Sequence, residues 1–123
     1  ANKMANNNQE FVNLLKGELA EKIEVLANDG NIIEIAEGST PIDFAYKIHS
    51  ELGNNMAAAL VNGNYVAFNY PLKKGDRVRI ITDISATGPT EEWLHWSVTE
   101  RAHKKIREFL NHQKRDLHLT RSP

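Results

Sequence analysis

The sequence predicts an α+β fold in which one helix lies across a mixed β-sheet. Apolar and polar residues alternate over 22–27 and again over 32–36, with Asp29-Gly30 between the two stretches. One amphipathic segment follows, and further alternating stretches come after it. The resulting order β-β-α-β-β-β within residues 22–84 is typical of a small sheet covered on one face by a single helix.

The first two strands are expected to form a hairpin. Asp-Gly supplies the positive φ angles that a tight two-residue turn requires, so strand 22–27 should fold back on strand 32–36. The next helix begins with Thr40 as its cap and Pro41 at its first position. Gly53 is its expected stop. The apolar stripe of this helix consists of Phe44, Ala45, Ile48 and Leu52.

A second hairpin and a last strand complete the predicted sheet. Residues 57–61 and 65–68 flank the turn pair Asn62-Gly63, and residues 77–80 alternate after a polar turn at 72–76. Because the helix carries the chain between the second and third strands, we expect a crossover and a parallel central pair. This is the β-grasp, ubiquitin-like architecture. The predicted core comprises Ile23, Val25, Ile33, Ile35, Phe44, Ile48, Leu52, Leu60, Val78 and Ile80.

Helical segments are expected on both sides of this unit. Residues 1–21 should hold a disordered start and a linker helix, and residues 88–118 should form a helical segment. In the latter, Thr90 caps a stretch that contains two tryptophans, and Thr99 caps a longer helix. The apolar stripe of the longer helix consists of Ala102, Ile106, Phe109 and Leu110.

Composition excludes several classes of protein. With 123 residues, 41% of them apolar, the chain is long enough for one small domain with helical extensions. It has no cysteine, which excludes a disulfide framework and a thiolate metal site. No apolar run is long enough to cross a membrane, so we expect a soluble, cytoplasmic protein without a membrane partner. The net charge is −1, yet the last 23 residues, 101–123, are strongly basic, which is common where a protein meets phosphates.

Catalysis by this chain is not expected. It has no glycine-rich phosphate loop, and its five histidines form no i, i+4 pair that would hold a metal. Ser39 and His49 lie ten residues apart along the predicted helix, roughly 15 Å at 1.5 Å per residue, too far for a nucleophile and its base. The sequence therefore predicts neither a cofactor nor a catalytic site.

Five residues are candidates for contact with RNA. His49 falls at the border of the apolar stripe, where it either covers the core edge or presents its imidazole to a base or phosphate. The four cations of the last turn and strand either form a solvated face or contact phosphates together with the basic residues of 101–107. The candidate RNA-binding residues are His49, Lys73, Lys74, Arg77 and Arg79.

Residues 38–82 resemble the TGS domain, and in particular that of the long RelA/SpoT-type (p)ppGpp synthetase/hydrolases. The resemblance rests on the helix IDFAYKIH, the turn LKKGD and a tail with Trp-Leu followed by Lys-Ile-Arg. It continues through 88–113 and back to 11–30. TGS domains also occur in threonyl-tRNA synthetases and Obg-type GTPases, whose sequences the tail does not resemble.

The resemblance implies a regulatory fragment of a GTP pyrophosphokinase or (p)ppGpp hydrolase whose catalytic domains lie N-terminal to it. In this family the TGS domain reads the 3′ CCA end of deacylated tRNA on a starved ribosome, in the stringent response. His49 matches the family histidine associated with that end. Two alternatives remain: a module that binds acyl carrier protein, and an intramolecular contact with the catalytic domains through Trp93 and Trp96.

Overall fold

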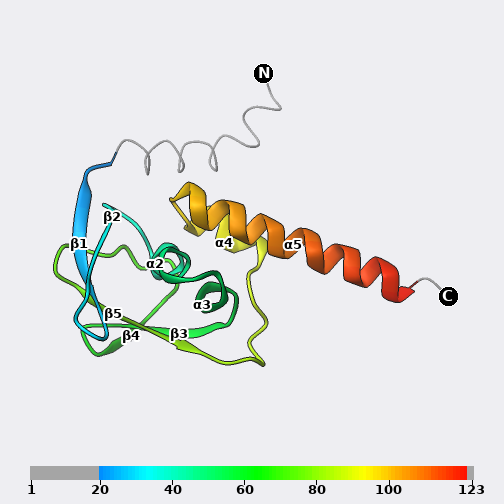
Figure 1. The fold of residues 1–123 in the computed structure, drawn as a ribbon, viewed down its shortest axis with the longest axis horizontal. Coiled ribbons are helices and arrows are strands. Elements are labelled where there is room, and N and C mark those ends of the chain that lie inside the picture. Colours follow the sequence, from blue (N-terminus) through cyan, green and yellow to red (C-terminus); the bar gives the residue numbers. More distant parts are fainter. Residues whose placement is uncertain (1–19, 122–123) are drawn as a thin grey trace, which may run out of the picture.

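The structure is a computed structural model that describes residues 20–121, with side chains as far as residue 113. Its core is a five-stranded mixed sheet in the order β2-β1-β5-β3-β4. Two short helices cover one face of the sheet, and a long helix extends past them, as Figure 1 shows. The linker helix predicted within residues 1–21 lies outside the described residues. The elements are β1 (Lys22–Ala27), β2 (Ile32–Ala36), α2 (Pro41–Ile48), α3 (Ser50–Asn54), β3 (Met56–Val61), β4 (Asn64–Val66), β5 (Arg77–Thr82), α4 (Glu91–Trp96) and α5 (Glu100–Arg121).

The predicted β-grasp topology is confirmed. Strand β1 pairs antiparallel with β2 and parallel with β5, so the expected parallel pair lies at the centre of the sheet. Strand β3 pairs antiparallel with both β5 and β4. Strands β1 and β2 have the predicted bounds, whereas β5 begins at Arg77 as predicted but continues to Thr82, beyond the predicted end at residue 80. Strand β4 ends at Val66, earlier than predicted, and Phe68 instead meets Trp93 edge-to-face, with ring centroids 5.4 Å apart.

The two hairpin turns differ from each other. Asn62 and Gly63 both have positive φ (53° and 86°), as a two-residue turn between right-twisted strands requires. The first hairpin has a three-residue loop instead, because Ala27 N donates to Asn31 O and, of the loop residues, only Gly30 has positive φ. Asp29 Oδ1 accepts from Asn31 N and stabilises this wider loop. The predicted two-residue turn at Asp29-Gly30 is therefore wrong, although the hairpin itself is present.

The predicted single helix is divided into α2 and α3. The backbone of His49 is extended (φ −166°, ψ 144°), so the first helix ends there and a second begins. Gly53 lies within α3 and does not stop the helix. A Cβ at Gly53 would come within 2.5 Å of the Tyr46 ring, so glycine is required there for close packing.

Helix α2 is buried on two sides, which explains the errors in the predicted core. One cluster joins the sheet to Phe44, and it consists of Val25, Ile35, Phe44, Val61, Leu72 and Val78. The other joins α2 to α4 and α5, and it consists of Ile42, Ala45, Tyr46, Met56, Trp93, Leu94, Ala102 and Ile106. The prediction assumed a helix buried on one face, so it missed Ile42 and Tyr46. It also placed Ile48 in the core, whereas that side chain is 42% exposed.

Candidate nucleic-acid interface

His49 lies on the surface at the break between α2 and α3. Its Nδ1 accepts a hydrogen bond from Glu51 N at 3.1 Å and so caps the first turn of α3. A neutral imidazole that accepts at Nδ1 carries its proton on Nε2. The exposed edge of the ring therefore presents an N–H donor to solvent.

The backbone on both sides of His49 holds the ring in place. His49 N donates to Ala45 O at 3.0 Å and closes the last turn of α2. His49 O in turn accepts from Leu52 N at 3.1 Å and from Gly53 N at 3.3 Å. Because both helices are anchored at this one residue, the imidazole projects from a rigid corner.

A groove runs beside His49 between the helices and strand β5. Its first hollow, of about 290 Å³, is lined by Ile48, His49, Glu51, Leu52, Asn55 and Thr82. A second hollow, of about 360 Å³, shares Ile48 and Leu52 with the first and extends to the β1–β2 loop. The exposed Ile48 side chain thus lies in both hollows, where it provides a flat apolar surface next to the imidazole.

One wall of the groove is the edge of strand β5. Strand β1 pairs with β5 only at Arg77 and Val78, whereas β5 continues to Thr82. Arg77 O accepts from Asn62 N, so the backbone groups of Arg77 face the β3 side. Alternate residues face the other way in an antiparallel pair, and the backbone N–H and C=O of Ile80 therefore point toward the groove.

The four predicted cations do not gather around His49. Lys73 and Lys74 are exposed in the turn before β5, near the start of α2, where Leu72 N donates to Ser39 O. Asp76 shapes this turn by accepting from Lys73 N at 2.8 Å. Lys73 and Lys74 are therefore at the opposite end of α2 from His49.

Arg77 and Arg79 extend from the face of the sheet that the helices leave open. Their neighbour Val78 is buried against Phe44 on the helix side, and side chains alternate along a strand. Arg77 Nη1 donates to Asn28 O at 3.2 Å, which orders that guanidinium. Arg79 also borders the second hollow, so it is the one cation of the four that reaches the groove.

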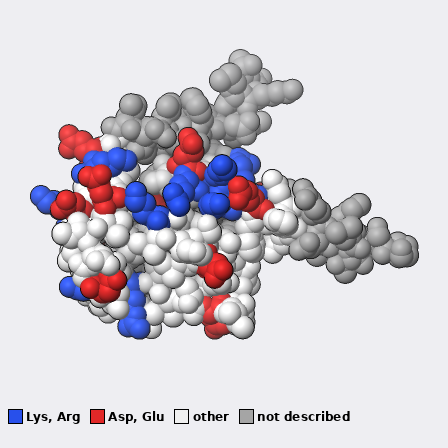
Figure 2. Space-filling view, viewed as in Figure 1, with Lys and Arg blue, Asp and Glu red and all other residues white. Residues whose placement is uncertain are grey.

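A second basic region lies where α5 meets α2. Figure 2 shows lysine and arginine side chains, mixed with carboxylates, along the start of α5. A hollow of about 280 Å³ there is lined by Lys22, Lys47 and Arg101 among others. Part of the predicted basic extension of the RNA-contacting surface therefore lies beside α2.

Sequence reasoning missed Asp43 as a structural centre. The side chain is 1% exposed, and its carboxylate accepts from five donors. Two belong to Thr40 at the start of α2, and three belong to Val98 and Thr99 at the start of α5. Burial raises the pKa of the Asp43 carboxyl, and these hydrogen bonds act in the opposite direction. The sequence revealed only the local capping position of Asp43, because the other donors come from 55 residues away.

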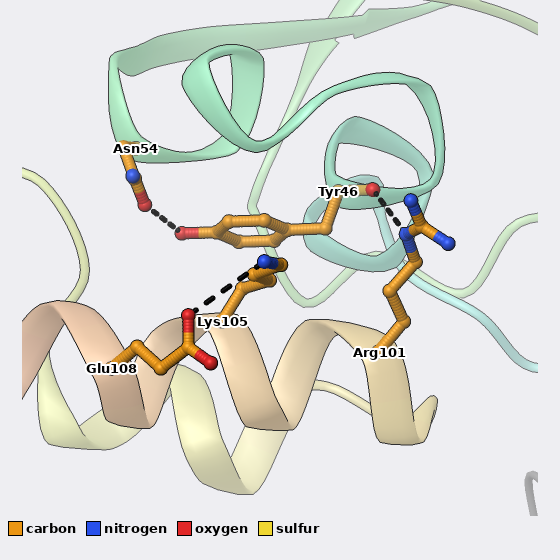
Figure 3. A network of polar contacts seen from close by, with 5 residues as sticks. All are labelled: Tyr46, Asn54, Arg101, Lys105 and Glu108. Carbon is orange, nitrogen blue, oxygen red and sulfur yellow. Dashed lines mark hydrogen bonds and ion pairs between the residues drawn. The ribbon is translucent and has the colours of Figure 1, made fainter.

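Figure 3 shows a second polar link between the same two helices. Tyr46 Oη donates to Asn54 Oδ1 at 2.7 Å, and Arg101 Nε donates to Tyr46 O at 3.1 Å. Lys105 extends from α5 toward the Tyr46 ring and pairs with Glu108 at 3.6 Å. Burial raises the pKa of the Tyr46 hydroxyl. Helix α2 is thus connected to α5 near both of its ends.

Trp93 is not available as an external docking anchor. Its side chain is 4% exposed within the cluster between α2 and α5, and Trp96 is half-buried beside it. Within residues 20–113, no group of three or more His, Asp or Glu side chains could hold a metal ion. Among the described helices, none is long and apolar enough to cross a membrane.

Comparison with known proteins identifies the class of domain. Residues 23–82 match the family model of the TGS domain, and the mixed sheet with its covering helix is the β-grasp fold of that family. The chain therefore carries a TGS domain.

The flanking residues define the type of TGS domain. The chain is 44% identical over 115 residues to a guanosine-3′,5′-bis(diphosphate) 3′-pyrophosphohydrolase of Aquifex aeolicus, which covers 93% of this chain and 16% of that protein. It is 37% identical over 112 residues to a GTP pyrophosphokinase of Myxococcus xanthus, covering 90% and 15%. It is 37% identical over 108 residues to the bifunctional (p)ppGpp synthase/hydrolase SpoT of Escherichia coli, covering 87% and 15%. This is a TGS domain of the RelA/SpoT type, and the chain spans about a sixth of the length of these relatives.

Proposed function

We propose that this domain regulates a RelA/SpoT-type (p)ppGpp synthetase or hydrolase in the cytoplasm by binding the 3′ CCA end of deacylated tRNA. The observation that carries the proposal is the exposed imidazole of His49, held at a rigid helix junction above the apolar side chain of Ile48. The active sites of the parent enzyme would lie outside this chain, and the domain itself would be non-catalytic.

The chemistry of the groove suits an unpaired RNA end. Unstacked bases bind to flat rings and apolar side chains and are then read by hydrogen bonds to their edges. The His49 ring and Ile48 offer such a surface, and Nε2–H offers a donor to a phosphate or ribose oxygen. The backbone of Ile80 adds one donor and one acceptor on the opposite wall.

The same groove gives a physical basis for rejecting charged tRNA. An aminoacyl ester adds bulk and a positive charge at the terminal ribose. If the terminal ribose binds between β5 and α3, which bound the groove, the added group must fit beside protein atoms on both sides. We therefore expect the deacylated end to bind more tightly than the esterified end.

A binding assay with two matched variants tests this proposal. A fluorescent RNA minihelix that ends in CCA is titrated with the chain, either deacylated or carrying an amide-linked aminoacyl group. His49→Asn removes the ring but keeps an oxygen that can cap α3, whereas His49→Ala removes both. Because base stacking on a ring contributes about 1–3 kcal/mol, both variants should bind the deacylated RNA about tenfold more weakly than the wild type. Equal binding of both RNAs by all three proteins would contradict the proposal.

A protein partner is the second candidate, and one observation favours it. Lys73 and Arg77 are exposed on surfaces that do not border the His49 groove. An acidic partner such as acyl carrier protein could bind there without occupying the groove. Reversal of both residues to Glu should then abolish capture of acyl carrier protein and leave the preference for deacylated RNA unchanged. Loss of that preference in the double variant would count against two separate surfaces.

A further inference from the structure

The open face of the sheet carries charges of both signs in an ordered pattern. Side chains at Val25, Ile33 and Val78 point toward the helices, where they are buried or partly buried. Their neighbours along the same strands must therefore point away from the helices. The side chains of β1, β2 and β5 that share this outer face include Lys22, Glu24, Leu26, Ile32, Glu34, Arg77 and Arg79.

The strand register places these side chains in three adjacent zones. Leu26 lies level with Ile32 on one side and with Arg77 on the other. Glu24 lies directly opposite Glu34, one pair closer to the start of β1. Arg79 lies two residues beyond Arg77, in the other direction. An apolar centre thus separates a basic pair from an acidic pair that is itself flanked by Lys22 on the same face.

Two features of this face are unfavourable in a single copy of the chain. Ile32 is 64% exposed, which leaves a large apolar side chain in water. Glu24 and Glu34 are like charges directly opposite each other on neighbouring strands, an arrangement that destabilises a sheet. No ion pair within residues 20–113 relieves that repulsion. A partner that covers the isoleucine and brings cations to the glutamates would remove both costs.

We propose that this face binds a second copy of the chain through a two-fold symmetric contact. A two-fold interface brings each surface patch against its symmetry mate, so it requires a self-complementary surface. With the axis in the plane of the interface, close to Leu26 and Ile32, the acidic pair of each copy meets the basic pair of the other. This inference goes beyond the proposed function, and of its residues only Arg79 also borders the candidate RNA groove.

The contact is expected to be weak and sensitive to salt. The patch spans three short strands, so we expect it to bury less than the roughly 1,200 Å² of stable interfaces. Its attraction comes largely from exposed charges, which salt screens. In the parent enzyme, two such domains would associate when other contacts raise their local concentration.

Charge reversal with complementation tests the proposal. Sedimentation equilibrium is measured from about 20 to 1,000 µM for three proteins: the wild type, Arg77→Glu with Arg79→Glu, and Glu24→Arg with Glu34→Arg. We expect the wild type to dimerise in the upper part of this range. Each double variant alone should remain monomeric, because its face carries a large excess of one sign of charge. An equimolar mixture of the two double variants should dimerise at least as strongly as the wild type.

A matched control distinguishes an effect at this face from a general effect of net charge. Lys73→Glu with Lys74→Glu makes the same change in net charge outside the patch and should leave the dimer intact. Far-ultraviolet circular dichroism checks that each variant is folded. A Glu24→Gln, Glu34→Gln variant replaces any reversal that does not fold, and it should also weaken the dimer.

A monomeric wild type at 1,000 µM overturns the proposal, as does a mixture that fails to associate. The minihelix assay of the Glu24→Arg, Glu34→Arg variant, which leaves both His49 and Arg79 intact, reports separately on the RNA site.

Discussion

The two ends of helix α2 differ sharply in burial. At its start, Asp43 is buried and its carboxylate accepts from donors of both α2 and α5. At its end, the helix breaks at His49, whose ring is exposed and accepts a capping hydrogen bond from Glu51 N. Both ends are thus connected to the following helices, but the first is buried whereas the second presents an exposed ring to a ligand. Because α2 has only eight residues, the groove at His49 lies close along the chain to the contact between Tyr46 O and Arg101 of α5.

Removal of the Asp43 carboxylate, at the buried end of α2, should cause the largest loss in the free energy of unfolding. Asp43→Ala leaves three backbone or hydroxyl donors at the start of α5 and two at Thr40 without a partner inside the protein. Each buried unsatisfied polar group costs about 1–3 kcal/mol, so we expect a loss of at least about 3 kcal/mol in the free energy of unfolding. Urea unfolding followed by circular dichroism measures it. Asp43→Asn keeps one oxygen acceptor and should lose less. A loss below about 1 kcal/mol for the alanine variant would show that solvent replaces the carboxylate easily.

A side chain at Gly53 should have the next largest effect, at the other end of the helix pair. A Cβ there would lie 2.5 Å from Tyr46 Cε1 and Cζ, and that ring is buried between α2, α3 and α5. Overpacking of this kind typically costs about 1–3 kcal/mol, so Gly53→Ala should lower the thermal midpoint. Ser50→Ala, in the same helix but half-exposed, is the matched control and should have little effect. If Gly53→Ala is as stable as Ser50→Ala, the Tyr46 ring can move aside, and the packing around Gly53 is loose enough to accept a Cβ.

The buried Tyr46 hydroxyl predicts a loss of stability in alkaline solution. Burial raises its pKa in the folded protein, whereas the same side chain in the unfolded chain ionises near its ordinary pKa of 10.0. The unfolded state therefore loses its proton first, and the free energy of unfolding should fall as the pH rises above 10. Urea unfolding at pH 8, 10 and 11 measures the trend. Tyr46→Phe should remove this part of the pH dependence at a cost of about 1 kcal/mol at pH 8. An identical pH trend in the variant would assign the effect to other groups.

Local pattern was sufficient to predict the sheet but not the contacts of α2. The alternation of residues and the Asn62-Gly63 and Asp29-Gly30 pairs predicted all five strands and both hairpins, because these signals act over a few residues. The break at His49 was not predicted, because the apolar spacing of Phe44, Ile48 and Leu52 continues across it. Asp43 was assigned only a capping role, since its other donors belong to a helix far along the chain.

The candidate site was only partly predicted, because local sequence signals do not show which distant side chains come together. His49 was selected by its position in the sequence, and the structure places it on the surface beside a groove. The four cations were grouped with it because they are basic, and charge alone carries no information on which face of a sheet a side chain occupies. The separation of Lys73 and Lys74 from His49 follows from the topology, which puts the start of β5 near the start of α2.

The smallest expected effect concerns the stability of the His49 corner itself. His49→Ala removes the Nδ1 acceptor of Glu51 N, and loss of an N-cap typically costs about 0.5–2 kcal/mol, here at the low end because Glu51 is exposed. His49→Asn restores a capping oxygen and should regain most of that stability. Urea unfolding of the two variants, set beside their RNA affinities, then separates the two roles of the residue. If the asparagine variant is as stable as the wild type but still fails to prefer deacylated RNA, the imidazole acts in recognition. If asparagine restores both properties, His49 acts only by capping α3 at the helix break. RNA binding at this end of α2 then depends on the backbone conformation there and not on the imidazole.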